Sequence, residues 1–107
     1  MNLDTRPELD YDLTIIRTTR RGAGGGTWVI GRLDGYRFDA LVFPQHAVNP
    51  DWEIGHSRIS KLGIQRTSDK ATVFNWDRGA DMEPQDDEVQ AVVDFLNGGL
   101  ADLIYGS

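Results

Sequence analysis

The stretch that decides the fold is residues 27–43, which read TWVIGRLDGYRFDALVF. Its two halves, 27–33 and 36–43, are rich in β-branched and aromatic residues, and such runs favour strands. Asp34-Gly35 stands between them and predicts a two-residue turn of type I′, in which both central residues have positive φ. The stretch therefore predicts an antiparallel hairpin. Alternation along its second strand assigns one face to Tyr36, Phe38, Ala40 and Val42 and the other to Arg37, Asp39, Leu41 and Phe43.

Further strands are predicted on both sides of this hairpin. The segments 12–19, 57–65 and 71–76 are short and rich in β-branched and aromatic residues, and turn signals lie between them. The glycine-rich residues 22–26 suit a hairpin connection, and 44–55 forms a long loop with two prolines. Residues 1–10 are polar and aperiodic, so we expect a loosely held N-terminal arm.

The last quarter of the chain changes to the spacing of an amphipathic helix. Its first turn is expected to hold Asp86, Asp87 and Glu88, whose charge suits the positive end of the helix dipole. Gly98-Gly99 is expected to end the helix or to break it before a last short turn, because glycine favours the left-handed C-cap. The apolar stripe consists of Val89, Val92, Val93, Leu96, Leu100 and Leu103.

Together these elements predict an α+β fold: a single domain over 1–107 with an antiparallel meander of about five strands and one C-terminal helix packed on one face. Short connections make consecutive strands neighbours. One helix covers one face, yet apolar residues occupy both faces of three strands. The opposed sets are Trp28 and Ile30 against Val29 and Leu33, Phe38 and Val42 against Leu41 and Phe43, and Phe74 and Trp76 against Val73. An apolar patch of that size is unusual on a monomer, so we expect cover from the 44–55 loop, the N-terminal arm or a second subunit, and we predict a homo-oligomer formed through the uncovered sheet face.

Composition excludes several classes of protein. The 107 residues include no cysteine, which excludes disulfide scaffolds, thiolate metal sites and cysteine nucleophiles and favours a reducing cytoplasm. No run is long and apolar enough to span a bilayer, and the N-terminus does not resemble a signal peptide. The net charge of -6 comes from residues 81–107, which hold seven carboxylates and no Lys or Arg. Nucleic-acid binding is therefore not expected, and Arg17, Arg20 and Arg21 are interpreted as a solvated loop tip.

Few motifs suggest chemistry. The glycines of 22–26 do not form a phosphate loop, because no Gly-Lys-Ser/Thr follows and the next element is a strand. His46 and His56, with Asp51 and Glu53 between them, contain the right ligand types for a divalent metal, but their spacing matches no compact pattern. His56 with Asp77 or Asp39 is a second hypothesis, that of an acid–base pair. We expect no cofactor and assign no metal ligand or catalytic residue.

A polar cluster is the most distinctive candidate site. Its members lie on two segments that a hairpin would bring together: Arg58, Lys61, Asp77, Arg78 and Asp81. One interpretation is structural, an ion-pair network in which Arg78 binds a carboxylate bidentately. The other is a binding pocket in which arginine fixes an anionic group of an unknown small ligand. Trp28, Trp52, Trp76 and Tyr36 are candidates either for a ligand cleft or for the core.

Three segments carry a resemblance to a known family. They are Trp28-x-x-Gly31-x-x-x-Gly35-Tyr36-x-Phe38-x-Ala40-x-x-Phe43, Ser57-Arg58-Ile59-Ser60-Lys61-Leu62 and Asp77-Arg78-Gly79-x-Asp81-x-x-Pro84. Over about residues 27–97 the chain resembles small bacterial and phage-associated domains of unknown function, and it is similar to products of mobile gene cassettes. The resemblance implies a short sheet with a closing helix and brings no assigned activity.

Two hypotheses of function follow. The first is a non-enzymatic binding or interaction module that self-associates. The alternative is a small hydrolase- or isomerase-like enzyme, with His56 and Asp77 as base and orienting group and Arg58 or Arg78 as an anion clamp. A third, an acidic mimic of nucleic acid, would need carboxylates on the helix that are spaced like phosphates.

Overall fold

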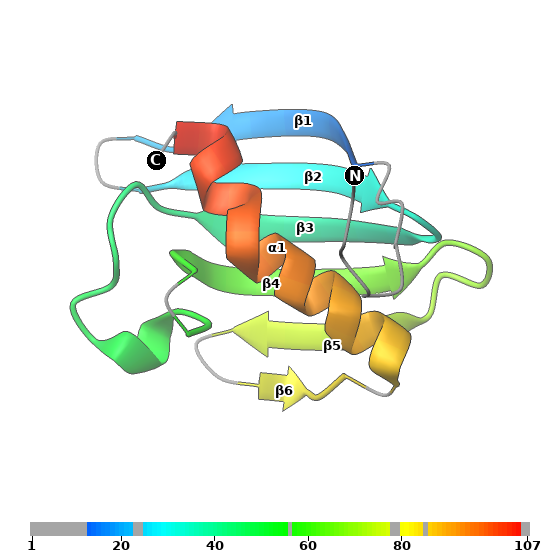
Figure 1. Ribbon diagram of the computed structural model, residues 1–107. Coiled ribbons are helices and arrows are strands. Elements are labelled where there is room, and N and C mark those ends of the chain that lie inside the picture. Colours follow the sequence, from blue (N-terminus) through cyan, green and yellow to red (C-terminus); the bar gives the residue numbers. More distant parts are fainter. Residues whose placement is uncertain (1–12, 23–24, 56, 78–79, 85, 106–107) are drawn as a thin grey trace, which may run out of the picture.

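Six antiparallel strands follow one another across a single sheet in the computed structural model, in the order β1-β2-β3-β4-β5-β6 (Figure 1). The structure describes residues 13–22, 25–55, 57–77, 80–84 and 86–105. The strands are β1 (Leu13–Arg20), β2 (Thr27–Leu33), β3 (Tyr36–Val42), β4 (Ile59–Arg66), β5 (Thr72–Asp77) and β6 (Ala80–Met82). The predicted α+β meander with one C-terminal helix is confirmed, and the short β6 is an addition to it.

The hairpin at the centre of the prediction pairs Leu33 with Tyr36 and Gly31 with Phe38, so its register is as expected. The turn differs from type I′. Asp34 has a φ of 53°, whereas Gly35 lies outside the left-handed region. The predicted two-residue connection is therefore confirmed, but of its two residues Asp34 alone has a positive φ.

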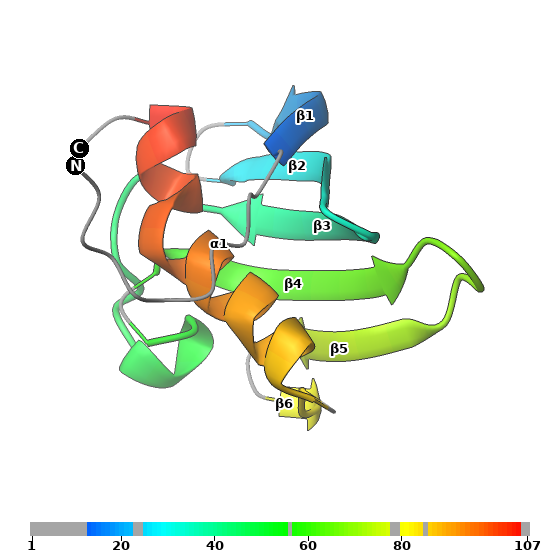
Figure 2. The same ribbon diagram turned by 45° about the vertical axis from the view of Figure 1, so that its right-hand side comes forward.

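Helix α1 (Asp87–Tyr105) crosses one face of the sheet (Figures 1 and 2). Asp86 caps it, because its Oδ1 accepts a hydrogen bond of 2.8 Å from the Val89 amide. The prediction that Gly98-Gly99 ends or breaks the helix is wrong. The helix continues for six residues past Gly99, since Leu100 and Ala101 beyond the glycines are buried.

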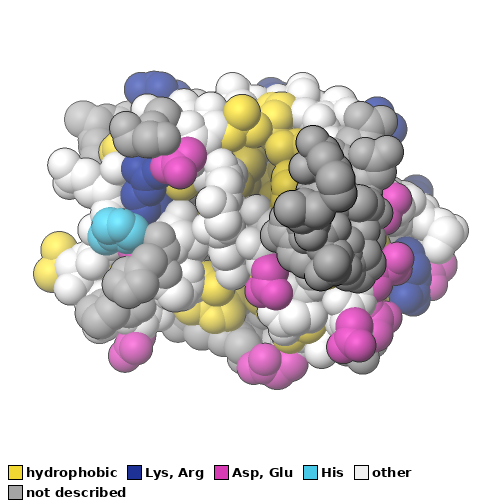
Figure 3. All heavy atoms as spheres, viewed as in Figure 1, with side chains coloured by type: hydrophobic (Ala, Val, Ile, Leu, Met, Phe, Trp, Pro, Cys, Tyr) yellow, Lys and Arg dark blue, Asp and Glu magenta, His cyan; other side chains and the backbone are white. Residues whose placement is uncertain are grey.

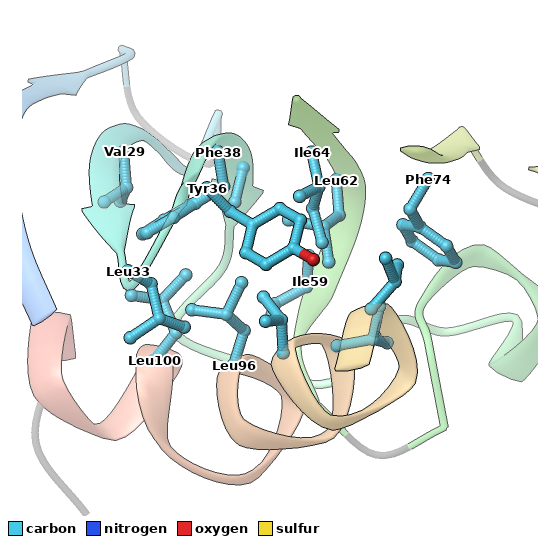
Figure 4. Close-up of a cluster of buried hydrophobic side chains, with 14 of the residues drawn as sticks. Val29, Leu33, Tyr36, Phe38, Ile59, Leu62, Ile64, Phe74, Leu96 and Leu100 are labelled. Atoms are coloured by element: carbon cyan, nitrogen blue, oxygen red, sulfur yellow. The ribbon is translucent and has the colours of Figure 1, made fainter. Parts of the chain in front are cut away.

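The core lies between α1 and the sheet (Figure 4). Phe38 is 1% exposed and its ring fills the space above Gly31, where a Cβ would lie 2.7 Å from the ring. Burial of such a side chain stabilises the fold by about 1.5–3 kcal/mol. The largest fully buried side chains are Phe38, Leu33, Ile59, Leu62, Ile64, Leu96, Leu100, Val29, Val42, Val89 and Val92.

Hydrogen bonds fix α1 to the sheet at both ends. Near its start, the Tyr36 hydroxyl donates to Glu88 Oε1 at 2.5 Å. Burial and this carboxylate together raise the pKa of Tyr36. At its end, the Tyr105 hydroxyl lies 2.6 Å from Thr27 Oγ1 and donates to the Val42 carbonyl at 3.2 Å. The helix is thus held in one position across the strands.

The face of the sheet opposite α1, called the open face below, carries no described helix (Figure 2). It is less apolar than the sequence suggests. A β-bulge in β5 turns Val73 into the core beside Phe74, so Val73 does not occupy the opposite face. Trp28 and Ile30 are partly buried and Leu41 is buried. Most of the exposed large apolar side chains lie elsewhere, Val48 and Trp52 in the loop and Phe95 and Leu103 on α1, while Ile16 lies at the β-bulge of β1.

Candidate functional site

The open face consists of rows of side chains that cross the strands. Residues paired across antiparallel strands share a face, so the register defines each row. The row nearest the β2–β3 turn, called the arginine row below, is exposed at every position and holds Thr14, Arg32, Arg37, Gln65 and Thr72. The next row holds Arg17, Ile30, Asp39, Gly63 and Asn75. The third holds Thr19, Trp28, Leu41, Lys61 and Asp77.

A groove of about 230 Å³ opens on this face above Gly63. Glycine there leaves a gap between larger neighbours, and the Asp39 carboxylate lies 3.0 Å from the position that a Cβ would take. Side chains that border the groove include Trp28, Lys61, Gln65, Thr72, Asn75 and Asp77. Trp76 borders it as well, so the groove combines two indoles, one cation, two carboxylates and two amides.

Asp39 is the group of the groove with a shifted pKa. Asp39 is exposed, but its neighbours desolvate the carboxylate and raise its pKa above the ordinary value; the nearby Arg37 and the residue's own backbone amide offset only part of that effect. Its carboxylate forms no ion pair with a described residue. A partly desolvated carboxylate without such a partner accepts hydrogen bonds from a ligand readily.

The predicted polar cluster is only partly assembled. Lys61 Nζ lies 3.8 Å from Asp77 Oδ1 on the open face. Arg58 lies on the other side of the sheet, where it donates to the Pro44 carbonyl at 2.9 Å and to Asp102 Oδ1 of α1 at 2.5 Å. Arg78 lies outside the described residues, as does the side chain of Asp81 in β6.

The sequence did not suggest the direction of Arg58. Its φ of 64° places it in the left-handed region directly before β4, and from there the guanidinium reaches α1. Only 16% of this side chain is exposed. Arg58 therefore joins the loop before β4 to the helix and does not face Asp77.

The residues predicted as metal ligands form a different arrangement. Glu53 is 5% exposed, and its carboxylate binds His46 Nδ1 at 2.8 Å, the Ala47 amide at 2.6 Å and the Arg58 amide at 3.4 Å. Burial tends to raise the pKa of Glu53, but the three hydrogen bonds outweigh it and hold the pKa below the ordinary value. Asp51 lies in the 3-10 helix Pro50–Trp52, and its amide donates to Asn49.

Within the described part of the chain, no three His, Cys, Asp or Glu side chains gather as they would around a metal ion. His56, the second histidine of that hypothesis and the base of the acid–base hypothesis, lies outside the described residues. Glu53 is best described as the residue that holds the loop between β3 and β4 together.

Two hollows lie on the helix side. One of about 260 Å³ is bordered by His46, Ser57, Arg58, Asn97 and Asp102. The buried Oδ1 of Asn97 has no hydrogen-bond partner among the residues that the structure describes. The other is an apolar groove of about 520 Å³ between β1 and α1, bordered by Leu13, Phe95, Leu96, Leu100 and Leu103. Figure 3 views this side and shows an apolar patch beside scattered acidic side chains.

The aromatic residues divide between core and groove. Tyr36 is buried, and Trp76 packs against the core while bordering the groove. Trp28 borders the groove from the open face. Trp52 is 45% exposed in the 3-10 helix, away from the sheet. The groove thus receives two of the four aromatic side chains that the sequence singled out.

The arginine row is a candidate binding feature that the sequence analysis did not identify. Arg32 and Arg37 pair directly across β2 and β3, and each stands two positions from the Asp34-Gly35 turn. A two-residue hairpin connection places such positions opposite each other. The signal was therefore present in the sequence.

Comparison with known proteins assigns the chain to one family. The model of a protein family described as a domain of unknown function (DUF7678) matches residues 27–100, from the start of β2 into α1. Neither a curated protein nor a solved structure matches the chain. Within the described residues, no helix combines the length and apolar character that crossing a lipid bilayer requires.

Proposed function

Since the chain belongs to this family of domains of unknown function, we propose a function from its own surface: a non-enzymatic binding module that associates with a second copy of itself through the open face. The observation that carries the proposal is the composition of this face. It presents Trp28 and Ile30, both partly exposed, among arginine, lysine and aspartate side chains.

Such a composition is typical of interfaces that form and separate. Tryptophan and arginine are enriched in protein interfaces, and aromatic anchors often supply much of the binding energy. Helix α1 covers one face of the sheet, whereas the open face is broad and carries no described helix. A second copy is thus a partner that would remove Trp28 and Ile30 from water.

The charges of the open face also suit a two-fold contact. In a two-fold dimer the same patch of both copies meets, so the patch must complement itself. Arg37 and Asp39 are two residues apart on one strand, and Lys61 and Asp77 face each other on two strands. Unlike charges at such short spacing can pair reciprocally across a two-fold axis.

The alternative of a hydrolase or isomerase receives less support. Arg58 and Asp77, which that hypothesis places in one site, lie on opposite sides of the sheet. Arg58 forms an ion pair with Asp102, and Asp77 lies beside Lys61. The absence of cysteine remains consistent with action in a reducing cytoplasm.

Sedimentation velocity over a range of concentrations tests the proposal. We expect the wild-type protein to exceed the mass of its 12.0 kDa chain, with a fraction that grows with concentration. Ile30→Lys on the open face should return the protein to a monomer. The matched control Leu103→Lys replaces a side chain of α1 that is 58% exposed, and it should leave the association unchanged.

Thermal unfolding of both variants verifies that they fold. A wild-type protein that stays monomeric at every concentration would refute self-association. Association that survives in Ile30→Lys but disappears in Leu103→Lys would move the interface to the helix side and refute the assigned face.

A further inference from the structure

Two arginines face each other on the open face of the sheet. Arg32 on β2 pairs directly with Arg37 on β3, and both are exposed. Neither forms an ion pair with a described residue. Like charges at directly opposed positions of two strands destabilise a sheet. The pair therefore lowers the stability of the free protein, and an anion between the two guanidinium groups would reverse that effect.

The neighbours of the pair complete a line of hydrogen-bond donors. Thr14 lies beyond Arg32, while Gln65 and then Thr72 lie beyond Arg37. Adjacent strands are about 4.8 Å apart, so the two forked guanidinium groups reach one tetrahedral oxyanion together. Arginine suits this task better than lysine because its planar fork donates two parallel hydrogen bonds to phosphate.

The groove above Gly63 continues from this row, because Gln65 and Thr72 border the groove and belong to the row as well. Its other polar borders are the carboxylates of Asp39 and Asp77, the amide of Asn75 and the ammonium group of Lys61. The carboxylate and amide oxygens accept hydrogen bonds from hydroxyl groups. The two carboxylates outnumber the single cation, so the groove disfavours a second anionic group. A volume of about 230 Å³ is smaller than the pockets that take drug-sized ligands.

From these contacts we infer that the open face binds a small phosphorylated polyhydroxy compound, with its phosphate between Arg32 and Arg37 and its hydroxyl groups in the groove beside Asp39. The ligand is a small molecule rather than a nucleic acid. Asp39 and Asp77 would lie along the path of a longer polyanion, and the chain as a whole has a net charge of -6.

This inference does not rest on the proposed self-association. The two proposals share part of the open face, since Trp28, Asp39 and Asp77 border the groove and Arg37 is assigned to both, so the ligand and a second copy would compete for this face. Arg32 lies outside the residues assigned to self-association. Sedimentation of each variant alongside the binding measurements keeps the two questions separate. Loss of phosphate binding at unchanged mass in Arg32→Gln concerns the arginine row alone.

Isothermal titration calorimetry with three probes tests the inference: inorganic phosphate, glycerol 3-phosphate and glycerol. We expect glycerol 3-phosphate to bind more tightly than inorganic phosphate and glycerol not to bind measurably. Arg32→Gln and Arg37→Gln should each weaken binding of glycerol 3-phosphate by about tenfold or more, since each removes a charge-assisted hydrogen bond. The matched control Lys70→Gln removes an exposed cation from the turn between β4 and β5 and should bind like the wild type.

A second readout separates a binding role from a structural one. Because the Arg–Arg pair is repulsive, Arg32→Gln should raise the Tm of the ligand-free protein while it weakens binding. Absence of binding by both phosphate probes would overturn the inference, as would arginine variants that bind like Lys70→Gln. A single-stranded RNA oligonucleotide that binds more tightly than glycerol 3-phosphate would overturn the choice of a small ligand.

Discussion

Replacement of Gly98 or Gly99 by alanine should stabilise the protein. Both glycines lie inside α1, are exposed and have an ordinary helical backbone, and a Cβ at either position would meet nothing within 4 Å. Alanine in a helix interior is favoured over glycine by about 0.8–1.0 kcal/mol, because glycine loses more backbone entropy on folding. No steric cost opposes that gain here.

The expected magnitude is thus about 0.8–1.0 kcal/mol for each variant and about twice that for Gly98→Ala/Gly99→Ala. For a domain of this size, 1 kcal/mol corresponds to about 4 °C in Tm. Urea unfolding followed by far-ultraviolet circular dichroism gives the free energy of unfolding. The denaturation midpoint should rise while the m-value stays constant.

Gly31→Ala is the matched control with the opposite sign. Its Cβ would lie 2.7 Å from the Phe38 ring and 2.8 Å from the Thr14 carbonyl oxygen, so the core must shift. Overpacking of this kind costs about 1–3 kcal/mol. If Gly98→Ala and Gly99→Ala were neutral or destabilising at constant m-value, the continuity of α1 through these residues would be refuted.

Three other predictions concern polar groups of the fold. Glu53→Gln should cost about 1–3 kcal/mol at neutral pH, because the Glu53 carboxylate is buried and hydrogen-bonded. Its lowered pKa means that this contribution is lost as pH falls through the folded-state pKa, so urea unfolding of the variant should depend less on acid pH than that of the wild type. Asp39→Asn should raise the free energy of unfolding at neutral pH, because the raised folded-state pKa of Asp39 means that the fold disfavours the ionised carboxylate. The gain should vanish below the ordinary carboxyl pKa of about 3.9. A gain that persists in acid would contradict this. Tyr105→Phe removes the hydrogen bonds to Thr27 and Val42 and should cost about 1 kcal/mol in thermal unfolding, whereas an unchanged Tm would show that the end of α1 is not docked.

Much of the fold could be predicted because local and long-range signals agree. Residues 27–43 combine strand propensity, alternation and a short turn, and the observed register follows from them. What could not be predicted depends on packing between elements. The bulge in β5 turns Val73 into the core, and burial of Leu100 and Ala101 continues α1 past two glycines that alone favour a stop.

The candidate site shows the same division. The approach of Lys61 to Asp77 follows from pairing of adjacent strands, and the Arg32–Arg37 pair follows from the short hairpin turn. The contact of Arg58 with Asp102 does not follow from the sequence, because it joins a left-handed loop residue to a helix 44 residues later. Alternation along a strand thus indicates open-face neighbours well, whereas it gives no information on contacts that a loop makes with the helix.

Pairing of every strand with its neighbours in sequence has a consequence for the growing polypeptide. Each hairpin can close as soon as its second arm leaves the ribosome, but the element that shields the inner side of the sheet is synthesised after all six strands. Until then, Phe38, Leu62 and Ile64 remain exposed to water and to other nascent chains. A ribosome that stalls before residue 87 would release a sheet with an exposed apolar face, which is the kind of aggregation-prone product that chaperones retain and proteases remove.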